Sequence, residues 1–245
     1  MRFDWKRFGA VLFDLDGVLT PTASVHAAAW KQTFDHFLDE WAHIGNPRQA
    51  PFDMDAEYRS FVDGRPRFDG VATFLTSRGI DLPRGQPQEQ PGLATICQIG
   101  NLKNELVNRI LATDGVDAYP GSVELVVSLK DAGMALAVVS ASANAEAVLE
   151  AAGIAKFFSV RVDGVVAAEL GLRGKPAPDP FLEGARRLGV LPEATVVIED
   201  AVSGVEAAVA GHFGAVIGVD RHDDPEALSA AGATVVVSDL SELAP

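Results

Sequence analysis

Cysteine is nearly absent from this sequence, because Cys97 is the one thiol among 245 residues. A single cysteine cannot form an intramolecular disulfide or a cysteine-rich zinc site, and a buried thiol in a reducing cytosol is the expectation. Long apolar runs are also lacking. The N-terminal apolar stretch at 10–13 ends at Asp14 and is too short for a signal peptide. The most apolar long window, 134–155, is interrupted by polar and charged residues and cannot supply the roughly 20 apolar residues of a membrane span. We expect a soluble, cytoplasmic protein.

Positive charge is scarce as well. The sequence has 20 Lys and Arg against 34 Asp and Glu, for a formal net charge of −14. Such a surface repels phosphate backbones and anionic lipids, which argues against nucleic-acid and membrane partners. The 48% hydrophobic and 22% charged fractions are typical of a globular protein. We expect a small-molecule partner, and a monomer.

Short apolar runs alternate with helical patterns over most of the chain. The runs are 10–13, 135–139, 195–198, 215–219 and 234–237, and the helical patterns are 122–132, 143–152, 179–188, 202–210 and 224–231. Runs of this length are typical of strands buried on both faces of a parallel sheet. Their alternation with helices predicts an α/β fold with a doubly wound parallel sheet.

The stretch from 22 to 117 breaks this alternation. Its first helical pattern places five large apolar residues on one face, namely Trp30, Phe34, Phe37, Leu38 and Trp41. Further helical patterns cover 56–62, 68–77 and 102–112, and a loop rich in Pro, Gly and Gln covers 81–92. We predict a helical domain at 22–117, inserted after the first strand of a core domain formed by 1–21 and 118–245.

Carboxylates follow two of the predicted strands, at the sheet edge where open α/β folds bind ligands. Asp14 and Asp16 follow the first strand, and Glu199 and Asp200 follow the run at 195–198. Two unit charges 4 Å apart repel by about 4 kcal/mol at an effective dielectric constant of 20, so this cluster needs a cation. Hard carboxylate oxygens favour Mg²⁺. Each motif alone is more often a turn or a helix cap, but together they predict a magnesium site.

Two further residues match phosphate chemistry. Ser140 follows the run at 135–139, and Lys175 precedes the helix at 179–188. A hydroxyl and an ammonium group are suitable donors for phosphoryl oxygens. Phosphoryl transfer requires a nucleophile, a divalent metal, a cation and positioning donors, and this sequence supplies a candidate for each.

The four segments 14–20, 140–144, 174–179 and 199–204 together resemble the haloacid dehalogenase-like phosphotransferase superfamily, and the resemblance covers nearly the whole chain. It implies a Rossmann-like core with a helical cap domain inserted after the first strand. It also implies that Asp14 is the nucleophile that becomes an aspartyl phosphate, and that Asp16 is the general acid–base.

The same resemblance implies the remaining core roles. Ser140, Ala141 and Lys175 hold the phosphoryl group. The Mg²⁺ ligands are Asp14, Asp16 through its backbone carbonyl, Glu199 and Asp200. The second Asp of the first motif excludes dehalogenase chemistry, since those relatives lack it.

The inserted segment resembles the cap of β-phosphoglucomutases at 20–31, 62–70 and 100–104. This implies a set of sugar-phosphate-binding residues: His26, Trp30, Gly64, Arg67 and Lys103. Ser142 and Asn144 are expected to add substrate-binding donors from the core side. Arg67 is suited to bidentate contact with the distal phosphate. By itself, Trp30 is more typical of the core of the helical domain.

Three positions depart from the mutase pattern. Pro21 and Ala143 replace a common Asp and a common Lys, and Asp63 stands where a Lys often precedes the loop glycine. Fewer cations at the distal phosphate favour a phosphatase, whereas Arg65 and Lys103 provide alternative positive charge.

The leading hypothesis is a Mg²⁺-dependent β-phosphoglucomutase, which interconverts β-glucose 1-phosphate and glucose 6-phosphate through a 1,6-bisphosphate. The alternative is a sugar-phosphate phosphatase with the same site and water as acceptor. A third reading is a non-catalytic phospho-acceptor module. Receiver domains of that kind are about half this length and have no inserted domain.

Overall fold

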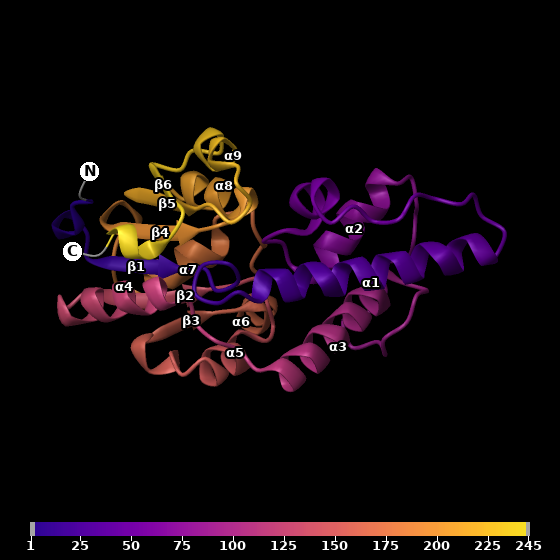
Figure 1. Ribbon diagram of the computed structural model, residues 1–245, viewed down its shortest axis with the longest axis horizontal. Coiled ribbons are helices and arrows are strands. Elements are labelled where there is room, and N and C mark those ends of the chain that lie inside the picture. Colours follow the sequence, from indigo (N-terminus) through magenta and orange to yellow (C-terminus); the bar gives the residue numbers. More distant parts are fainter. Residues whose placement is uncertain (1–2, 244–245) are drawn as a thin grey trace. The chain divides into compact units, whose positions relative to one another are not determined.

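The computed structural model describes residues 3–243 (Figure 1). The chain forms two compact units. One contains Met1–Thr22 and Val116–Pro245 and is called the core unit below; the other contains Ala23–Gly115 and is called the inserted unit.

The core unit is built on a sheet of six parallel strands in the order β3-β2-β1-β4-β5-β6. The strands are β1 (Ala10–Phe13), β2 (Ala135–Val139), β3 (Val160–Val162), β4 (Thr195–Glu199), β5 (Ala215–Val219) and β6 (Val235–Val237). Every residue of β1, β4 and β5 is buried, as expected of strands covered on both faces. The predicted parallel α/β fold is confirmed.

Six α-helices accompany this sheet (Figure 1). They are α4 (Pro120–Asp131), α5 (Ala145–Ala151), α6 (Gly164–Leu170), α7 (Asp179–Leu188), α8 (Val202–Ala210) and α9 (Pro225–Ala230). The chain winds outward from β1 to β3 and then from β4 to β6, so right-handed crossovers place helices on both faces. On one face, Phe181 of α7 and Val205 of α8 share a core with Leu12, Val139 and Val197.

The structure adds a strand and a helix that the sequence patterns did not predict. β3 is a three-residue edge strand whose central Arg161 is half-buried, so it has no apolar run to signal it. The next helix, α6, is capped at its N-terminus by Asp163, whose carboxylate accepts from the N–H groups of Val165 and Val166. Several predicted boundaries also shift by one or two residues; for example, the last strand begins at Val235 and α5 begins at Ala145.

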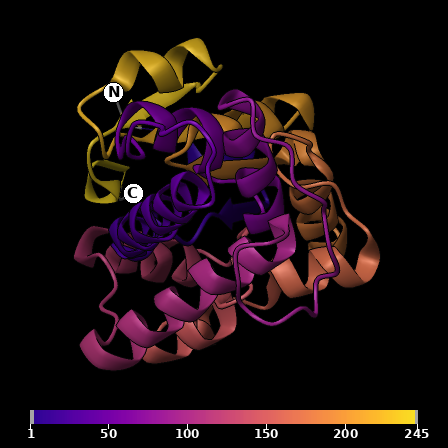
Figure 2. The ribbon, with the colours of Figure 1, turned by 90° about the vertical axis from the view of Figure 1, so that its right-hand side faces the viewer.

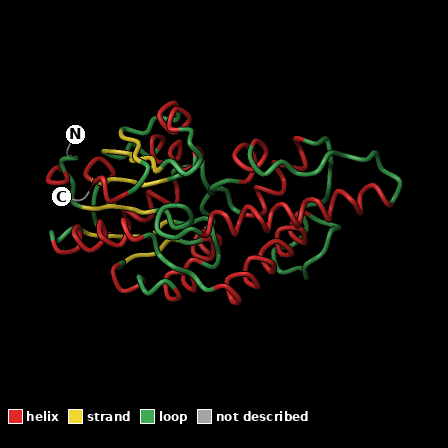
Figure 3. The backbone as a smooth tube through the Cα atoms, viewed as in Figure 1, coloured by secondary structure: helices red, strands yellow, loops and turns green. Residues whose placement is uncertain are grey.

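All regular elements of the inserted unit are helical (Figure 3). They are α1 (Thr22–His43), seen nearly end-on in Figure 2, the π-helix η2 (Tyr58–Val62), α2 (Arg67–Ser77) and α3 (Ile96–Asp114). The predicted apolar face of α1 forms the core of this unit. The Phe34 ring centroid lies 4.9 Å from that of Trp30 and 4.0 Å from that of Phe74 on α2.

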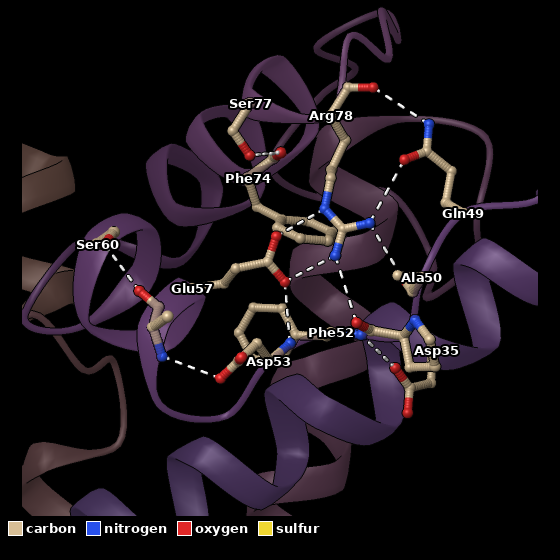
Figure 4. Close-up of polar contacts among 12 residues, drawn as sticks. Asp35, Gln49, Ala50, Phe52, Asp53, Glu57, Ser60, Phe74, Ser77 and Arg78 are labelled. Carbon is tan, nitrogen blue, oxygen red and sulfur yellow. Dashed lines mark hydrogen bonds and ion pairs between the residues drawn. The ribbon is translucent and has the colours of Figure 1, made fainter.

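An ion pair secures the loop between α1 and η2 (Figure 4). Arg78, which follows α2, donates to Glu57 at 2.6 and 2.7 Å and to the carbonyl of Ala50 at 2.9 Å. The N–H of Phe52 donates to Asp35 on α1 at 2.8 Å. These contacts hold the 49–57 loop against two helices.

Within residues 3–243, none of the helices combines the length and the apolar character that crossing a bilayer demands.

Candidate active site

Three buried carboxylates meet at the carboxyl ends of β1 and β4. Phe13 and Ile198 are partners in the parallel pairing of these strands, so the residues that follow them are adjacent. Asp14, Glu199 and Asp200 each place a carboxylate oxygen within 4.8 Å of the others, and all three side chains are buried. The structure therefore brings together three of the four carboxylates singled out from the sequence.

Lys175 lies within this cluster. Its Nζ donates to Asp14 Oδ1 and to Glu199 Oε1, both at 2.5 Å, and the residue is 3% exposed. Burial opposes the charge on Lys175, but the two carboxylates outweigh it and raise the pKa of its ammonium group. Lys175, which the sequence places just before a helix, is thus a charged residue in contact with two of the carboxylates.

Negative charge still exceeds what Lys175 neutralises. Burial holds the pKa of Asp14 well above its usual range, and Glu199 and Asp16 raise it further, whereas Lys175 opposes this effect. A divalent cation would relieve this excess. Three buried carboxylates provide the hard oxygen donors that Mg²⁺ prefers, so the residues present fit this ion.

The Asp16 carboxylate does not belong to this group of three. It accepts a hydrogen bond from Thr22 Oγ1 and one from Ser140 Oγ at 3.3 Å. Thr22 Oγ1 in turn lies 2.8 Å from Thr20 Oγ1. The Asp16 side chain thus has hydrogen-bond partners of its own, although its charge still acts on Asp14, and its backbone carbonyl as a metal ligand stays a prediction.

Two glycines allow the carboxylates to approach the backbone. A Cβ at Gly17 would lie 1.7 Å from Asp200 Oδ2, and a Cβ at Gly204 would lie 1.9 Å from Glu199 Oε1. Gly17 also has a positive φ of 83°. Gly17 and Gly204 lie within the two acidic motifs of the sequence. They could have indicated that a carboxylate packs against the backbone at these positions.

The loop after β2 contains four candidate residues, Ser140, Ala141, Ser142 and Asn144. Its shape depends on the unpredicted β3 and α6. The Ser140 N–H donates to the carbonyl of Val162 at 3.0 Å, and the Gly164 N–H donates to the carbonyl of Ser142 at 3.0 Å. A Cβ at Gly164 would lie 2.7 Å from the Ala141 carbonyl oxygen.

Inside that loop, serine hydroxyls replace helix hydrogen bonds. Ser140 Oγ accepts from the Ser142 N–H at 3.0 Å, and Ser142 Oγ accepts from the Asn144 N–H at 3.1 Å. Because of these turns, α5 begins only at Ala145. Ala143, one of the departures from the mutase pattern, therefore lies in the loop.

The inserted unit brings three of its candidates together. Lys103 Nζ lies 2.8 Å from His26 Nδ1 and 4.8 Å from the ring centroid of Trp30. Lys103 and Trp30 are only 4% and 3% exposed. Trp30 is a member of the apolar core, as its helical spacing indicated, and it also provides an aromatic face for a buried cation.

Arg67 begins α2, just after a turn in which Gly64 has a positive φ of 68°. Its guanidinium lies 4.4 Å from the Phe68 ring centroid, and Nη2 donates to Asn101 Oδ1 at 3.3 Å. Burial lowers the pKa of Arg67. Asn101, which the sequence analysis did not single out, also donates to two carbonyls of the 81–92 loop at 3.0 and 2.8 Å.

The core unit combines a six-stranded parallel sheet with a cluster of buried carboxylates and the buried Lys175. This combination is typical of one class of phosphoryl-transfer proteins. The model of the haloacid dehalogenase-like hydrolase family matches residues 8–212. The chain belongs to this family.

Curated relatives show that it is an enzyme, either a mutase or a related phosphatase. A "Beta-phosphoglucomutase" of Mycobacterium tuberculosis is 46% identical over 241 residues, which cover 97% of this chain and 92% of the relative. The "Fructose-1-phosphate phosphatase YqaB" of Escherichia coli is 31% identical over 214 residues, covering 86% of this chain and 97% of the relative.

The solved structures include a similar fold with a bound ligand. A mutant of CbbY from Rhodobacter sphaeroides, crystallised with xylulose-(1,5)bisphosphate, has a TM-score of 0.70 and 28% identity. The match covers 96% of each chain.

Proposed function

We propose that this protein is a Mg²⁺-dependent β-phosphoglucomutase that interconverts β-glucose 1-phosphate and glucose 6-phosphate. The observation that carries the proposal is that two neighbouring aspartates have different hydrogen-bond partners. Asp14 is bound to Lys175 in the buried cluster, whereas Asp16 is held by Thr22 and Ser140. One carboxylate is thus available as nucleophile and the other as acid–base.

The first half-reaction transfers a phosphoryl group to the enzyme. An oxygen of the Asp14 carboxylate attacks phosphorus, the bond from phosphorus to the sugar oxygen breaks, and Asp16 gives its proton to that oxygen. In the reverse direction Asp16 removes the proton of a sugar hydroxyl, which attacks the aspartyl phosphate. Transfer to the 6-hydroxyl of β-glucose 1-phosphate gives the 1,6-bisphosphate, and transfer from its 1-position then releases glucose 6-phosphate.

The core unit provides the groups around the transferred phosphoryl group. Asp14, Glu199 and Asp200 would hold Mg²⁺, which neutralises charge on the phosphoryl oxygens when bound. Lys175 orients Asp14 by donating to one of its two oxygens. In the proposed complex the ammonium group of Lys175 and the hydroxyl of Ser140 bind phosphoryl oxygens.

The inserted unit is proposed to act as the cap and to bind the rest of the sugar phosphate. Arg67 would contact the distal phosphate, and the buried Lys103 beside His26 provides a second cation in this unit. Gly64, Ser142 and Asn144 are proposed as further substrate contacts. Cations of this kind compensate for the absence of a lysine at Ala143.

A sugar-phosphate phosphatase is the second candidate, favoured by the neutral Ala143 and by the relative from Escherichia coli. The two functions differ only in the acceptor, which is a sugar hydroxyl or water. A non-catalytic phospho-acceptor is disfavoured, because the hydrogen bonds of Asp16 to Thr22 and Ser140 present an acid–base two residues from Asp14.

The test is incubation of the purified protein with β-glucose 1-phosphate, Mg²⁺ and a trace of glucose 1,6-bisphosphate. We expect glucose 6-phosphate to form without stoichiometric release of inorganic phosphate, and we expect EDTA to stop the reaction. α-Glucose 1-phosphate is the matched control and should not react. Release of phosphate without glucose 6-phosphate would establish the phosphatase instead.

A further inference from the structure

A side chain outside the family motifs holds the turn that contains the Asp16–Gly17 peptide. We propose that Arg221 is a positioning residue for the candidate metal site, which it shapes through the backbone of Gly17 and thereby through Asp200. This inference rests on the proposed Mg²⁺ site but not on the identity of the sugar.

Arg221 follows β5 and connects loops that are distant in sequence. Its Nε donates to the carbonyl of Gly17 at 2.7 Å, and its Nη1 donates to the carbonyl of Ser238 at 3.1 Å. The guanidinium carbon lies 4.0 Å from the ring centroid of Tyr119, which precedes α4. One side chain therefore joins the loops after β1, β5 and β6 to the start of α4.

Three successive carbonyls of the turn accept hydrogen bonds from outside it. Gly17 accepts from Arg221, Val18 accepts from Ser122 Oγ at 2.7 Å, and Leu19 accepts from the Tyr119 N–H at 2.9 Å. Of these three donors, Arg221 alone is charged, and a charge-assisted bond is the stronger kind. Glycine restricts its own backbone least, so the orientation of Gly17 depends most on an external donor.

The orientation of Gly17 matters because the Asp200 carboxylate lies directly against it. The site of a Cβ on Gly17 is 1.7 Å from Asp200 Oδ2. A rotation of the backbone at Gly17 would therefore displace Asp200 and the preceding Asp16 peptide together. Asp200 and Arg221 also both act on Tyr119: burial raises the pKa of its phenol, Arg221 opposes the rise and Asp200 adds to it.

Arg221 acts indirectly in this arrangement. Its two hydrogen bonds go to backbone carbonyls, so it is assigned neither to substrate nor to metal. Hydrogen-bonding partners behind metal ligands typically change metal affinity about 10–100-fold when they are removed. A residue that only stabilised the fold would change the melting temperature without this effect.

The experiment measures Mn²⁺ binding to the full-length protein by electron paramagnetic resonance, which needs no substrate. We expect Arg221→Gln to raise the Kd for Mn²⁺ about tenfold, and Arg221→Lys, which keeps the charge and one donor, to raise it less. Arg187→Gln is the control, since Arg187 is an exposed core-unit arginine that likewise donates to a backbone carbonyl, that of Arg161, and also to Glu183. We expect this control to bind Mn²⁺ as the wild type does.

A folded Arg221→Gln variant that binds Mn²⁺ within about twofold of the wild type would overturn the proposal, because removal of a residue behind metal ligands should cost about 10-fold or more. If that variant does not fold, Arg221→Lys decides by the same criterion, and loss of fold in both variants would assign Arg221 a purely structural role. Failure of the proposed function is distinguishable. A protein that makes no glucose 6-phosphate, yet binds Mn²⁺ in an Arg221-dependent way, refutes the mutase alone.

Discussion

Gly17 and Asp200 lie in such close contact that the position of a Cβ on Gly17 is 1.7 Å from Asp200 Oδ2. The two residues come from the turns after β1 and β4, which pair in the sheet. The glycine of the first motif is therefore a steric requirement of the second.

We expect Gly17→Ala to abolish turnover and to weaken Mn²⁺ binding, because the new methyl group must displace the Asp200 carboxylate. Gly133→Ala is a matched control in the same unit: φ is 80° at Gly133 and 83° at Gly17, but no atom lies within 4 Å of a Cβ at Gly133. Both variants should lose about 1–2 kcal/mol of stability from left-handed backbone strain. Equal Mn²⁺ affinity in the two variants would contradict the steric role of Gly17.

Asp14→Asn should abolish turnover and leave the fold intact, because an amide oxygen cannot form the acyl phosphate. The buried Lys175 keeps its contact with Glu199 in this variant, so it is not left without a carboxylate. Intact-mass spectrometry after exposure to glucose 1,6-bisphosphate should detect a phosphorylated wild type and an unmodified variant. Circular dichroism provides the folding control, and measurable multiple turnover in Asp14→Asn would exclude Asp14 as the nucleophile.

Arg67→Ala should raise the KM for sugar phosphate about 10–100-fold, the range expected when a hydrogen bond to a charged group is lost. Mn²⁺ affinity should be unchanged. Asn101→Ala should shift KM in the same direction by less, since Asn101 Oδ1 accepts from Arg67 Nη2. Arg109→Ala, at an exposed ion pair with Glu105 in the same unit, is the control. A rise in KM accompanied by an equal loss of Mn²⁺ affinity would argue against a substrate-binding role for Arg67.

Glu57→Gln should lower the free energy of unfolding near pH 7 by about 1–2 kcal/mol, because Glu57 is a bidentate, mostly buried partner of Arg78. The hydrogen bonds from Arg78 lower the pKa of Glu57 below its ordinary value of 4.5. A lowered folded-state pKa stabilises the protein above the unfolded pKa, and this contribution is lost as the pH falls through the folded value.

The difference between wild type and Glu57→Gln in urea unfolding should therefore be largest at neutral pH and decline below about pH 4.5. Glu105→Gln, at the exposed pair with Arg109, should change stability by less than about 0.5 kcal/mol. A difference that grows on acidification would contradict the ion pair's contribution.

Local patterns predicted most of the fold and the core of the site. β1, β4 and β5 are continuous apolar runs, so their existence and the adjacency of the residues after them follow from burial on both faces of a parallel sheet. The Lys175 contact with Asp14 spans 161 positions. The sequence placed both residues at the edge of the sheet where ligands bind, but it did not predict this contact.

Other features leave no local pattern. β3 is short and carries Arg161 at its centre, and it is recognisable only because β2 pairs with it. Thr22, Gly164 and Arg221 act on the site through hydrogen bonds or steric fit with distant segments. Their residue types are common in turns and at helix ends, so only these contacts in the folded structure reveal their role at the site.

The amino-acid sequence by itself determined the parallel α/β class, the helical insertion and the acidic residues at the strand ends, because these depend on hydrophobic periodicity and on residue type. Tertiary structure alone decided that the Asp16 carboxylate accepts from Thr22 and Ser140, that Gly17 has no room for a side chain beside Asp200, and that Lys103 is buried beside His26. Those features depend on distances between segments far apart in the chain, and such distances exist only after the chain has packed.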